Sequence, residues 1–463
     1  MQSSQAKKYQ MMTETPIKRL IMKLALPAIV SMMISSIYNM ADTYFIGQLS
    51  AGSAAATSAT AAVGVAFPLM SIIQAVGFMF GHGSGNFISR ALGRQETEDA
   101  ERMAATGFFS ALIAGLLLSV LGLSCLEPLC RLLGSTDTIL PYAKDYIGII
   151  LIGTPWMCAS LVLNNQLRFQ GNAFFSMIGI SIGGIVNILL DPLFIFALDM
   201  GIAGAALATI ISQLLSFCLL FIGILKSDNL KIRLRNFTPK LRFFKEMFKG
   251  GAPSLFRQGI GSVASTCLNN VAASVVEASL ADPAIAALSI VSRIMMFANS
   301  LVIGFGQGFQ PVCGFNYGAK KYTRVREAFY FCVKLGTAVL LIAAALGLCF
   351  APDIITLFRG DDPAVIEIGS LALRLQCITM PLFAFVVLSN MMLQTIAQTV
   401  RASLLAVARQ GLFFLPILLV LAYTIGLFGI QLTQPIADVF SFLLALLLQG
   451  KTWKEIRKLE EHL

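Results

Sequence analysis

Long apolar runs recur along the whole of this chain, and they limit what it can fold into. Each run has about 20 residues, the length that a helix needs to cross the hydrocarbon core of a bilayer. Short or basic segments separate the runs. The sequence therefore predicts an all-α polytopic membrane protein with twelve transmembrane helices. We place the spans at residues 17–46, 55–84, 100–126, 138–162, 173–198, 202–225, 251–276, 285–313, 327–350, 364–390, 402–425 and 430–449.

The composition agrees with this prediction and excludes several other classes of protein. Hydrophobic residues make up 57% of the chain and charged residues only 13%, whereas a soluble domain has about 25% charged residues. The nine cysteines are scattered without a Cys-x-x-Cys pair, and the two histidines are His82 and His462. Neither structural zinc nor a disulfide framework is expected. We expect no cofactor, only H⁺ or Na⁺ as a coupling ion.

The basic residues are divided unevenly between the two sides of the predicted membrane. Most of the 34 Lys and Arg residues fall in segments on the side of the N-terminus. The opposite loops hold Arg131, Lys144, Arg359 and Arg374. Both termini are therefore expected in the cytoplasm, at a bacterial plasma (inner) membrane. The first 16 residues are polar and lack a signal-peptide pattern, so the first run is expected to be a retained span. The net charge of +10 then reflects topology and contact with membrane lipids, not nucleic-acid binding.

The two halves of the chain are a repeat. A shift of 225 residues lays Gly81-His-Gly83 on Gly306-Gln-Gly308, and Gly201–Gly204 on Gly426–Gly429. Six spans per half is an even number, so both halves insert the same way round, as two parallel lobes that bind a substrate between them and alternate its access. The expected units are an N-lobe (1–225), a basic cytoplasmic linker (226–250), a C-lobe (251–450) and a cytoplasmic tail (451–463).

The fifth span contains a carboxylate. Asp191 would lie in the hydrocarbon, where a lone acid costs several kcal/mol and is usually functional. Asn187 precedes it by four residues and shares its helix face. Pro192 follows it and should loosen the helix at the acid. This group can hold a proton or a small cation; alternatively, Asp191 only satisfies the backbone that Pro192 frees.

Two further segments carry a family resemblance. They are Tyr38-Asn-Met-Ala-Asp42-Thr-Tyr-Phe-Ile-Gly47 in span 1 and Phe309-Gln-Pro-Val-Cys-Gly-Phe-Asn-Tyr-Gly318-Ala after span 8. With the two six-span lobes, they resemble the multidrug and toxic compound extrusion (MATE) family over residues 15 to 450, most closely the branch with MepA-type and DinF-type exporters. The resemblance implies export of amphipathic organic cations in exchange for protons or sodium ions. It also implies that Asp42, Asn187, Asp191 and Thr209 bind the coupling ion.

The depths of these residues are compatible with one site. Asp191 lies eight residues before the turn at Asp199 and Thr209 ten after it, so both lie about 12–15 Å from the outer surface. Asp42 is shallower. Their oxygens are hard ligands that suit Na⁺ or a proton, and of two neighbouring acids one can stay protonated near neutral pH. Alternatively, Asp42 is an interfacial acid and the Thr209 hydroxyl bonds to its own helix.

The C-lobe does not repeat the acid pair. When the two halves of the sequence are aligned, Leu415 stands at the position equivalent to Asp191. An internal ion pair or a water-lined wall is expected there, since an unpaired charge would not persist. Another branch of the family places its coupling acids in the C-lobe, so Glu277 and Asp438 are the alternative coupling residues. The charged residues in or near C-lobe spans are Arg257, Glu277, Arg293, Arg409 and Asp438.

Polar residues near the expected lobe contact are candidates for the substrate cavity. The 34 Phe and 19 Met residues suit an adaptable apolar cavity for aromatic cations. Gly81-His-Gly-Ser-Gly85 lacks the lysine of a phosphate loop, so its small residues indicate close helix packing, with His82 as a packing or gating residue. The cavity candidates are Gln74, His82, Arg293, Asn299, Gln307 and Gln310.

Two other functional classes are alternatives to a monomeric exporter. A flippase for a lipid-linked or amphipathic anionic substrate shares the two-lobe plan. Arg257 and Arg293 favour it, and Asp42 and Asp191 oppose it. A membrane-embedded enzyme would need a nucleophile–base pair or a motif such as His-Glu-x-x-His, which the sequence lacks. The sequence therefore predicts a secondary exporter, not an enzyme.

Overall fold

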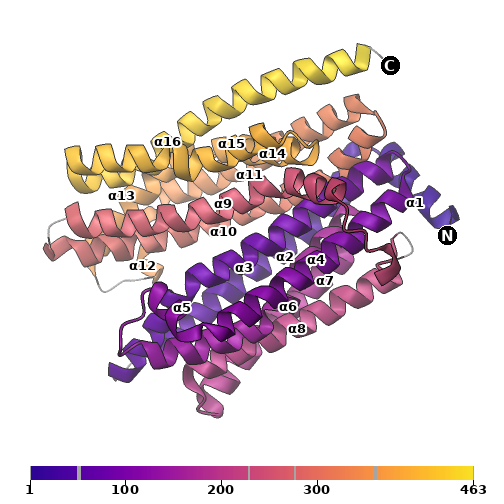
Figure 1. Ribbon diagram of the computed structural model, residues 1–463. Helices are drawn as coiled ribbons and strands as arrows, with labels where there is room; N and C mark the ends of the chain where they lie inside the picture. Colours follow the sequence, from indigo (N-terminus) through magenta and orange to yellow (C-terminus); the bar gives the residue numbers. More distant parts are fainter. Residues whose placement is uncertain (1, 50–53, 228–229, 276–277, 359–361, 462–463) are drawn as a thin grey trace.

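The computed structural model describes residues 2–49, 54–227, 230–275, 278–358 and 362–461. These residues form helices and turns, and no strand occurs among them. Helix α1 (Gln2–Glu14) and the C-terminal end of α16 (Phe414–Glu461) lie on one side of the molecule, which we call the termini side (Figure 1). The short helices α5 (Leu126–Leu132) and α12 (Ala351–Phe358) lie on the opposite side, the far side (Figure 1).

The helices of the N-terminal half pack into one group, which corresponds to the predicted N-lobe. Helix α3 packs against α4 and α6, α6 against α8, and α7 against both α2 and α8. A π-helical turn, η1, follows α7 directly. The bounds are α2 (Ile17–Leu49), α3 (Ala54–Gly93), α4 (Thr97–Ser124), α6 (Leu140–Phe169), α7 (Ala173–Pro192), η1 (Leu193–Ala197) and α8 (Gly201–Lys226).

The helices of the C-terminal half form the second group, shown in pink to yellow in Figure 1. Helix α10 packs against α11, α13 and α14, and α16 packs against α9, α13 and α14. The 3₁₀ turn η2 (Leu234–Asn236) precedes this group. The bounds are α9 (Leu241–Val275), α10 (Ala278–Gly318), α11 (Tyr322–Cys349), α13 (Pro363–Thr379), α14 (Leu382–Thr395), α15 (Thr399–Val407) and the π-helical turn η3 (Ala408–Leu412).

Each of the twelve predicted spans has a helical counterpart. In the described part of the chain, nine helices are long and apolar enough to cross a membrane, or ten if α13 and α14, bent by 57°, form one span. The apolar stretch Thr399–Glu461, which comprises α15, η3 and α16, covers two predicted spans, because its helical geometry breaks at Ile425 and Gly426. Helix α9, the counterpart of span 7, is not among the ten, and its polar side chains face the other lobe, as described below.

The repeat is visible in the backbone as well as in the sequence. Six residues that take positive φ angles stand in three pairs, and the members of each pair are 225 or 226 residues apart. Each pair ends or begins a helix at equivalent places in the two halves. The pairs are Gln95 (φ 63°) with Lys320 (φ 59°), Gly171 (φ 81°) with Ala397 (φ 61°), and Gly201 (φ 54°) with Gly426 (φ 63°).

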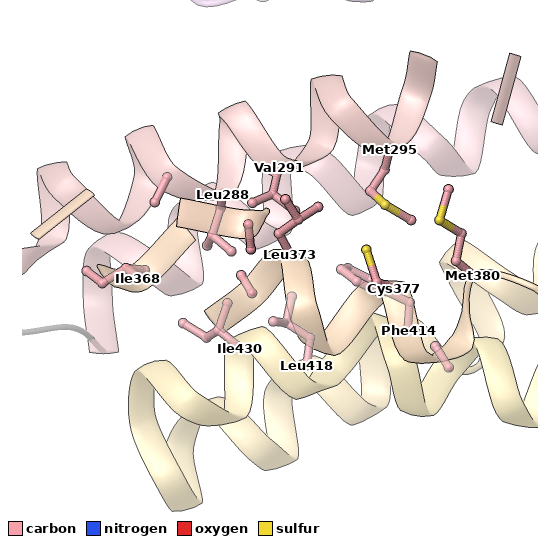
Figure 2. Close-up of a cluster of buried hydrophobic side chains, with 14 of the residues drawn as sticks. Leu288, Val291, Met295, Ile368, Leu373, Cys377, Met380, Phe414, Leu418 and Ile430 are labelled. Carbon is pink, nitrogen blue, oxygen red and sulfur yellow. The ribbon is translucent and has the colours of Figure 1, made fainter. Parts of the chain in front are cut away.

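Each lobe has its own apolar core. In the C-lobe, side chains of α10, α13 and α16 interlock around Leu288, Val291, Leu373 and Leu418 (Figure 2). In the N-lobe, a second cluster joins the far-side parts of α3, α6 and α8 around Ile73, Ile147 and Ala205. Each half therefore buries apolar surface within itself.

The lobes meet closely on the termini side through glycines. A Cβ added to Gly83 on α3 would lie 2.2 Å from the carbonyl oxygen of Met247 on α9. The equivalent contact of the repeat is Gly308 on α10, where a Cβ would lie 2.5 Å from the Cα of Ala25 on α2. These contacts confirm that the Gly81–Gly85 motif serves helix packing. They fall in the termini-side halves of the four helices, so this conformation is closed on the termini side.

Helix α1 crosses the contact between the lobes on the termini side. Lys8 donates a hydrogen bond to Asn172, which lies between α6 and α7 of the N-lobe. Asn316 on α10 of the C-lobe donates to the carbonyl of Met12 over 3.0 Å, and Arg324 on α11 donates to the carbonyl of Thr15 over 2.6 Å. The α1 segment is therefore bound to both lobes at the place where they close.

Candidate functional site

The first candidate site lies where α2 and α7 pack closely. A Cβ on Gly184 of α7 would lie 3.2 Å from side-chain atoms of both Ile34 and Tyr38 of α2, so the two helices pack closely at this glycine. Asp42 follows Tyr38 by one helical turn, and Asp191 follows Gly184 by two. The carboxyl groups of Asp42 and Asp191 are close enough to interact electrostatically. Two acids from different helices thus meet in one lobe.

Asp191 is fully buried and incompletely paired. Asn187 donates a hydrogen bond to its Oδ1 over 3.3 Å, as the four-residue spacing predicts. The other oxygen, Oδ2, is buried and has no hydrogen-bond partner among the described residues. Oδ1 of Asp42 is buried without a described partner as well. A buried acid oxygen without a partner is costly, and a proton or a cation would satisfy both of them.

Two tyrosines complete the surroundings of the acids. The phenol of Tyr146 on α6 lies within electrostatic range of Asp42, Asp191 and Tyr38. Tyr38 precedes Asp42 by four residues, so the sequence could have identified it as a neighbour on the same helix face. Tyr146 is on a different span, and no spacing rule connects it with the acids. Phenols can donate hydrogen bonds to carboxylates, so both tyrosines can support the charged form.

Thr209 on α8 lies at the level of the acid site along the bundle. The antiparallel packing of α7 and α8 is fixed by two glycines, since Gly183 meets Ser216 and Gly204 meets Phe194. This register puts Thr209 within about one helical turn of the levels of Asn187 and Asp191. Its hydroxyl donates to the carbonyl of Ala205 over 3.0 Å, which is the alternative that the sequence left open. The hydroxyl oxygen can still accept a hydrogen bond or bind a cation.

Pro192 has the local effect that its position predicts. It ends the regular α-helix one residue after Asp191, and the π-helical turn η1 follows. Because proline lacks an N–H group, the normal ladder of backbone hydrogen bonds cannot continue there. In η1 the backbone hydrogen bonds span five residues instead of four. The Leu198 N–H, for example, donates to the Leu193 carbonyl over 2.9 Å. Such π-helical segments often occur at functional sites.

His82 lies in a polar chain that joins the two lobes. Arg168 on α6 contacts the Nε2 of His82 at 3.4 Å, and Ser254 on α9 contacts its Nδ1 at 3.2 Å. Gln394 on α14 donates to the hydroxyl of Ser254 over 2.8 Å. Because arginine can only donate, Nε2 of His82 must accept and Nδ1 carries the proton. His82 is therefore part of the lobe contact, in the place that a packing or gating residue would occupy.

The structure does not bring all the cavity candidates together. Gln74 accepts a hydrogen bond from Gln258 of the other lobe over 2.9 Å. Gln307 is also at a lobe contact, donating to the sulfur of Met32 over 3.4 Å. Arg293 is exposed and precedes Gln307 by 14 residues on α10, a rise of about 21 Å. One small ligand cannot contact both of them.

Gln310 and Asn299 also lie on α10. Gln310 is fully buried, and neither its oxygen nor its nitrogen has a hydrogen-bond partner among the described residues. Asn299 is half-buried, and its Oδ1 is likewise without a described partner. Buried amides without partners are rare in folded proteins. Both side chains have hydrogen-bonding capacity left for water or a ligand.

Two charged groups of the C-lobe form an internal ion pair, which is one of the two arrangements that the sequence left open. Nε of Arg409, in the π-helical turn η3, lies 2.7 Å from Oδ1 of Asp438. Gln434 donates to the same oxygen over 2.7 Å, and the guanidinium lies 4.4 Å from the ring centre of Phe383. Asp438 is thus neutralised, in contrast to Asp42 and Asp191. Glu277 lies outside the described residues.

Comparisons with known proteins identify the family of this chain. The family model MatE matches residues 27–193 and 260–420. The multidrug export protein MepA of Staphylococcus haemolyticus is 27% identical to this chain, and the match covers 94% of the chain and 93% of the relative. MepA of Staphylococcus aureus is 24% identical, with 94% of each protein covered.

Solved structures give the same result for the fold. One is described as the outward-facing conformation of a multidrug resistance MATE family transporter; its TM-score is 0.90 at 25% identity, with 98% of this chain and 99% of that chain covered. Another is a MOP superfamily transporter from Pyrococcus furiosus, described as having a binding pocket of reverse polarity; its TM-score is 0.88 at 25% identity with the same coverage. The twelve-helix, two-lobe architecture expected from the sequence is therefore confirmed.

Proposed function

Because this chain belongs to the MatE family of multidrug efflux transporters, we propose that it exports amphipathic organic cations by antiport with protons or sodium ions. The family consists of multi-pass membrane transporters, so the protein is a transporter and not an enzyme, as the sequence predicted. Its relatives are named multidrug export proteins. The coupling ion, the substrate class and the antiport mechanism belong to the proposal.

The incomplete pairing of the N-lobe acids is the observation that carries this proposal. Asp42 and Asp191 lie within electrostatic range of each other, and each has a buried oxygen without a described partner. Asp438 in the C-lobe has Arg409 and Gln434 as partners. A coupling site must bind and release a cation, which a free acid pair can do and a neutralised acid cannot. The coupling ion is therefore assigned to Asp42, Asn187, Asp191 and Thr209.

Ion binding at this site can act on the lobe contact through α2. Asp42 lies on the same helix as Ser36, whose hydroxyl is 2.8 Å from that of Ser300 on α10 of the other lobe. Further along α2, Ala25 packs against Gly308 of α10. Neutralising the acids would remove their mutual repulsion and change the packing of α2 on α7. The ion would thereby bias the equilibrium between the two conformations.

The basic residues predict how the molecule lies in the membrane. With both termini in the cytoplasm of a bacterium, the termini side faces the cytoplasm. The conformation described above is then closed toward the cytoplasm, and the exchange of a drug for an ion would take place on the outer side. We expect a monomer in the plasma membrane whose partners are amphipathic cations and lipids.

The test is dye transport in proteoliposomes, driven separately by a pH gradient and by a sodium gradient. We would compare the wild type with Asp191→Asn and Asp42→Asn. Asp199→Asn is a matched control, because Asp199 is an exposed residue of the same lobe whose positive φ of 50° suits asparagine. The gradient that drives a cationic dye in the wild type identifies the ion, and both site variants should lose gradient-driven transport.

The outcomes separate the alternatives. Normal transport by Asp191→Asn and Asp42→Asn would refute the N-lobe coupling site and direct attention to Asp438 and Glu277. No dye movement by the wild type under either gradient would refute export of cations, and flipping of a lipid-linked anionic substrate would be the next assay. Loss of transport in Asp199→Asn as well would mean that the variants report folding and not coupling.

A further inference from the structure

The segment that links the two lobes exposes several large apolar side chains. Leu234 in η2 is 72% exposed, and Leu241 at the start of α9 is 82% exposed. Phe244 and Phe248, on the next two turns of α9, are exposed as well. Leu241, Phe244 and Phe248 are spaced i, i+3 and i+7, so they share one face of the helix. The opposite face packs in a buried cluster with side chains of α3 and α4. An apolar face of this kind marks a contact surface.

The linker lies beside α4, at the edge of the lipid-facing part of that helix. Phe237 packs on Phe109 of α4, with the ring centres 5.8 Å apart, and the Thr238 N–H donates to the Thr106 hydroxyl over 3.1 Å. One turn beyond Phe109, Ile113 is exposed, and exposed apolar side chains of α4 continue from there toward the far side. In a multi-pass membrane protein these side chains face the hydrocarbon. The linker is therefore at the level where the hydrocarbon ends and the lipid headgroups begin.

Positively charged side chains accompany the apolar ones. Two linker cations have acid partners, since Arg242 lies 3.2 Å from Asp99 and Lys249 lies 2.7 Å from Glu246. Four other linker cations are exposed and have no described acid within 4.0 Å, namely Arg233, Arg235, Lys240 and Lys245. We call these four cations, together with Leu234, Leu241, Phe244 and Phe248, the linker face. It combines the two properties of an interfacial membrane-binding segment, an apolar side and basic residues.

Two acids of α4 lie near the linker face, and both have other partners. Glu98 and Glu101 line a surface pocket of about 320 Å³ together with Arg235 and Lys240. Glu98 pairs with Arg102 of its own helix at 2.5 Å. Glu101 accepts a hydrogen bond from the Asn236 side chain over 3.3 Å, and one from the backbone of the linker. The linker face, with four cations, therefore keeps a positive charge.

We propose that the linker face docks on an anionic phospholipid leaflet on the termini side. Its apolar side chains insert at the level of the glycerol groups, and its guanidinium and ammonium groups bind lipid phosphates. A neutral leaflet offers only the apolar part of this contact. The inference goes beyond the proposed efflux function, because it gives the linker an anionic lipid as its own partner. It depends on the chain spanning a membrane and not on the substrate or the coupling ion.

The test is hydrogen exchange of the full chain in nanodiscs of two compositions, measured by mass spectrometry. One nanodisc holds phosphatidylcholine alone, and the other holds equal parts of phosphatidylcholine and phosphatidylglycerol. The Thr238 N–H is a direct reporter, because its bond to Thr106 must break when the linker leaves α4. Each cation near an anionic surface shifts such an equilibrium by about fivefold, so residues 230–245 should exchange at least about tenfold more slowly with phosphatidylglycerol. The far-side segment 126–139, whose Arg131 pairs with Asp137, should exchange equally in both.

Charge variants locate the lipid dependence. The linker variant combines three substitutions, Arg235→Gln, Lys240→Gln and Lys245→Gln. It should remove most of the difference between the two compositions. The matched control removes the same charge from exposed positions of α16 on the termini side, with Lys451→Gln, Lys454→Gln and Lys458→Gln. The control should keep the full difference. The lipid comparison in the wild type needs no variant, so misfolding cannot hide the result.

A second pair of substitutions tests the apolar contact. Leu234→Ser with Leu241→Ser removes the two most exposed apolar side chains of the linker face. Because their insertion does not depend on lipid charge, linker exchange should become at least about tenfold faster in both compositions. The ratio between the two compositions should stay as in the wild type.

Each outcome decides the question. Equal linker exchange in the two compositions, or a difference that the α16 control removes as fully as the linker variant, would overturn the docking on an anionic leaflet. So would inorganic phosphate, if at matched ionic strength it slowed linker exchange in phosphatidylcholine as much as phosphatidylglycerol does. Unchanged exchange in Leu234→Ser with Leu241→Ser would exclude insertion of the apolar side chains. Gradient-driven dye transport together with lipid-independent linker exchange would refute the docking and leave the efflux function standing.

Discussion

Replacing Gly83 with alanine tests whether the lobe contact on the termini side holds the molecule closed. Gly83 lies inside α3, and an added Cβ would be 2.2 Å from the carbonyl oxygen of Met247, 2.9 Å from its carbonyl carbon and 3.0 Å from its Cα. All three atoms belong to the backbone of α9, so no side chain can turn aside. Helices α3 and α9 must separate by roughly 1 Å before the methyl group reaches ordinary van der Waals distance.

The cost of this substitution falls on the closed conformation. Overpacking of a well-packed contact typically costs about 1–3 kcal/mol. A conformation in which the lobes separate on the termini side avoids the clash and does not bear the cost. The equilibrium should therefore shift toward that conformation by about 5- to 150-fold. Alanine also has a higher intrinsic helix propensity than glycine by about 1 kcal/mol, but this gain is common to both conformations of α3.

Gly64→Ala is the matched control, because Gly64 lies in the same helix and an added Cβ would meet nothing within 4 Å. Spin labels at the exposed positions Glu98 on α4 and Glu327 on α11 would report the distance between the lobes by double electron–electron resonance. The nine native cysteines would be replaced first. Gly83→Ala should increase the population with a long distance. A distance distribution identical to that of Gly64→Ala would refute the packing argument.

Two further perturbations test the C-lobe ion pair and helix α1. Asp438→Ala leaves the guanidinium of Arg409 without its acid and should lower the stability of the protein by about 3 kcal/mol, measured as a lower Tm. The apolar double variant Arg409→Met with Asp438→Leu should recover most of this stability. An unchanged Tm in the single variant would contradict this reasoning. Burial and the nearby Lys23 lower the pKa of Lys8 to about 7 when α1 is docked. Docking therefore favours the neutral amine, and α1 should dock more strongly as the pH rises from 7 to 9. Hydrogen-exchange protection of α1, corrected for intrinsic rates, should rise over this range in the wild type and not in Lys8→Met; equal pH dependence in both would exclude Lys8 as the cause.

The apolar runs predicted the spans well because the membrane requires each crossing segment to satisfy its own backbone. The ends of the helices were harder to predict. Helices α3 and α14 continue to Gly93 and Thr395, beyond the predicted ends at 84 and 390. A helix keeps its backbone hydrogen bonds outside the hydrocarbon too, so hydropathy does not show where it stops. The bend between α13 and α14 was missed for a similar reason, since both parts are apolar.

The site was predictable where it depends on one helix and not where it depends on several. The bond between Asn187 and Asp191 follows from their spacing, and the same rule would have found Tyr38 beside Asp42. The position of Tyr146 near both acids depends on how α6 packs against its neighbours. This packing cannot be predicted from a single sequence. The partner of Asp438 could not be chosen either, because the π-helical turn η3 changes the face on which Arg409 points.

The repeat explains why the backbone contact between the lobes is symmetric, whereas the side chains at the two copies of this contact differ. The backbone contact of Gly83 with α9 recurs as that of Gly308 with α2. An offset of 225 residues also relates His82 to Gln307. In one copy of the contact Gln307 contacts the sulfur of Met32, and in the other His82 contacts Arg168 and Ser254.

The acids break the symmetry in the same manner. The N-lobe keeps two acids with unpartnered oxygens, whereas the C-lobe acid is neutralised by Arg409. If the two lobes were identical, each would bind an ion and a drug with the same affinity. Neither ligand could then shift the conformational equilibrium by binding to one particular lobe. In the proposed antiport, the unpartnered acids of one lobe bind the ion and the contact between the lobes binds the substrate, so the two ligands occupy separate positions. Each can then bias the same equilibrium, which is the requirement for coupled exchange.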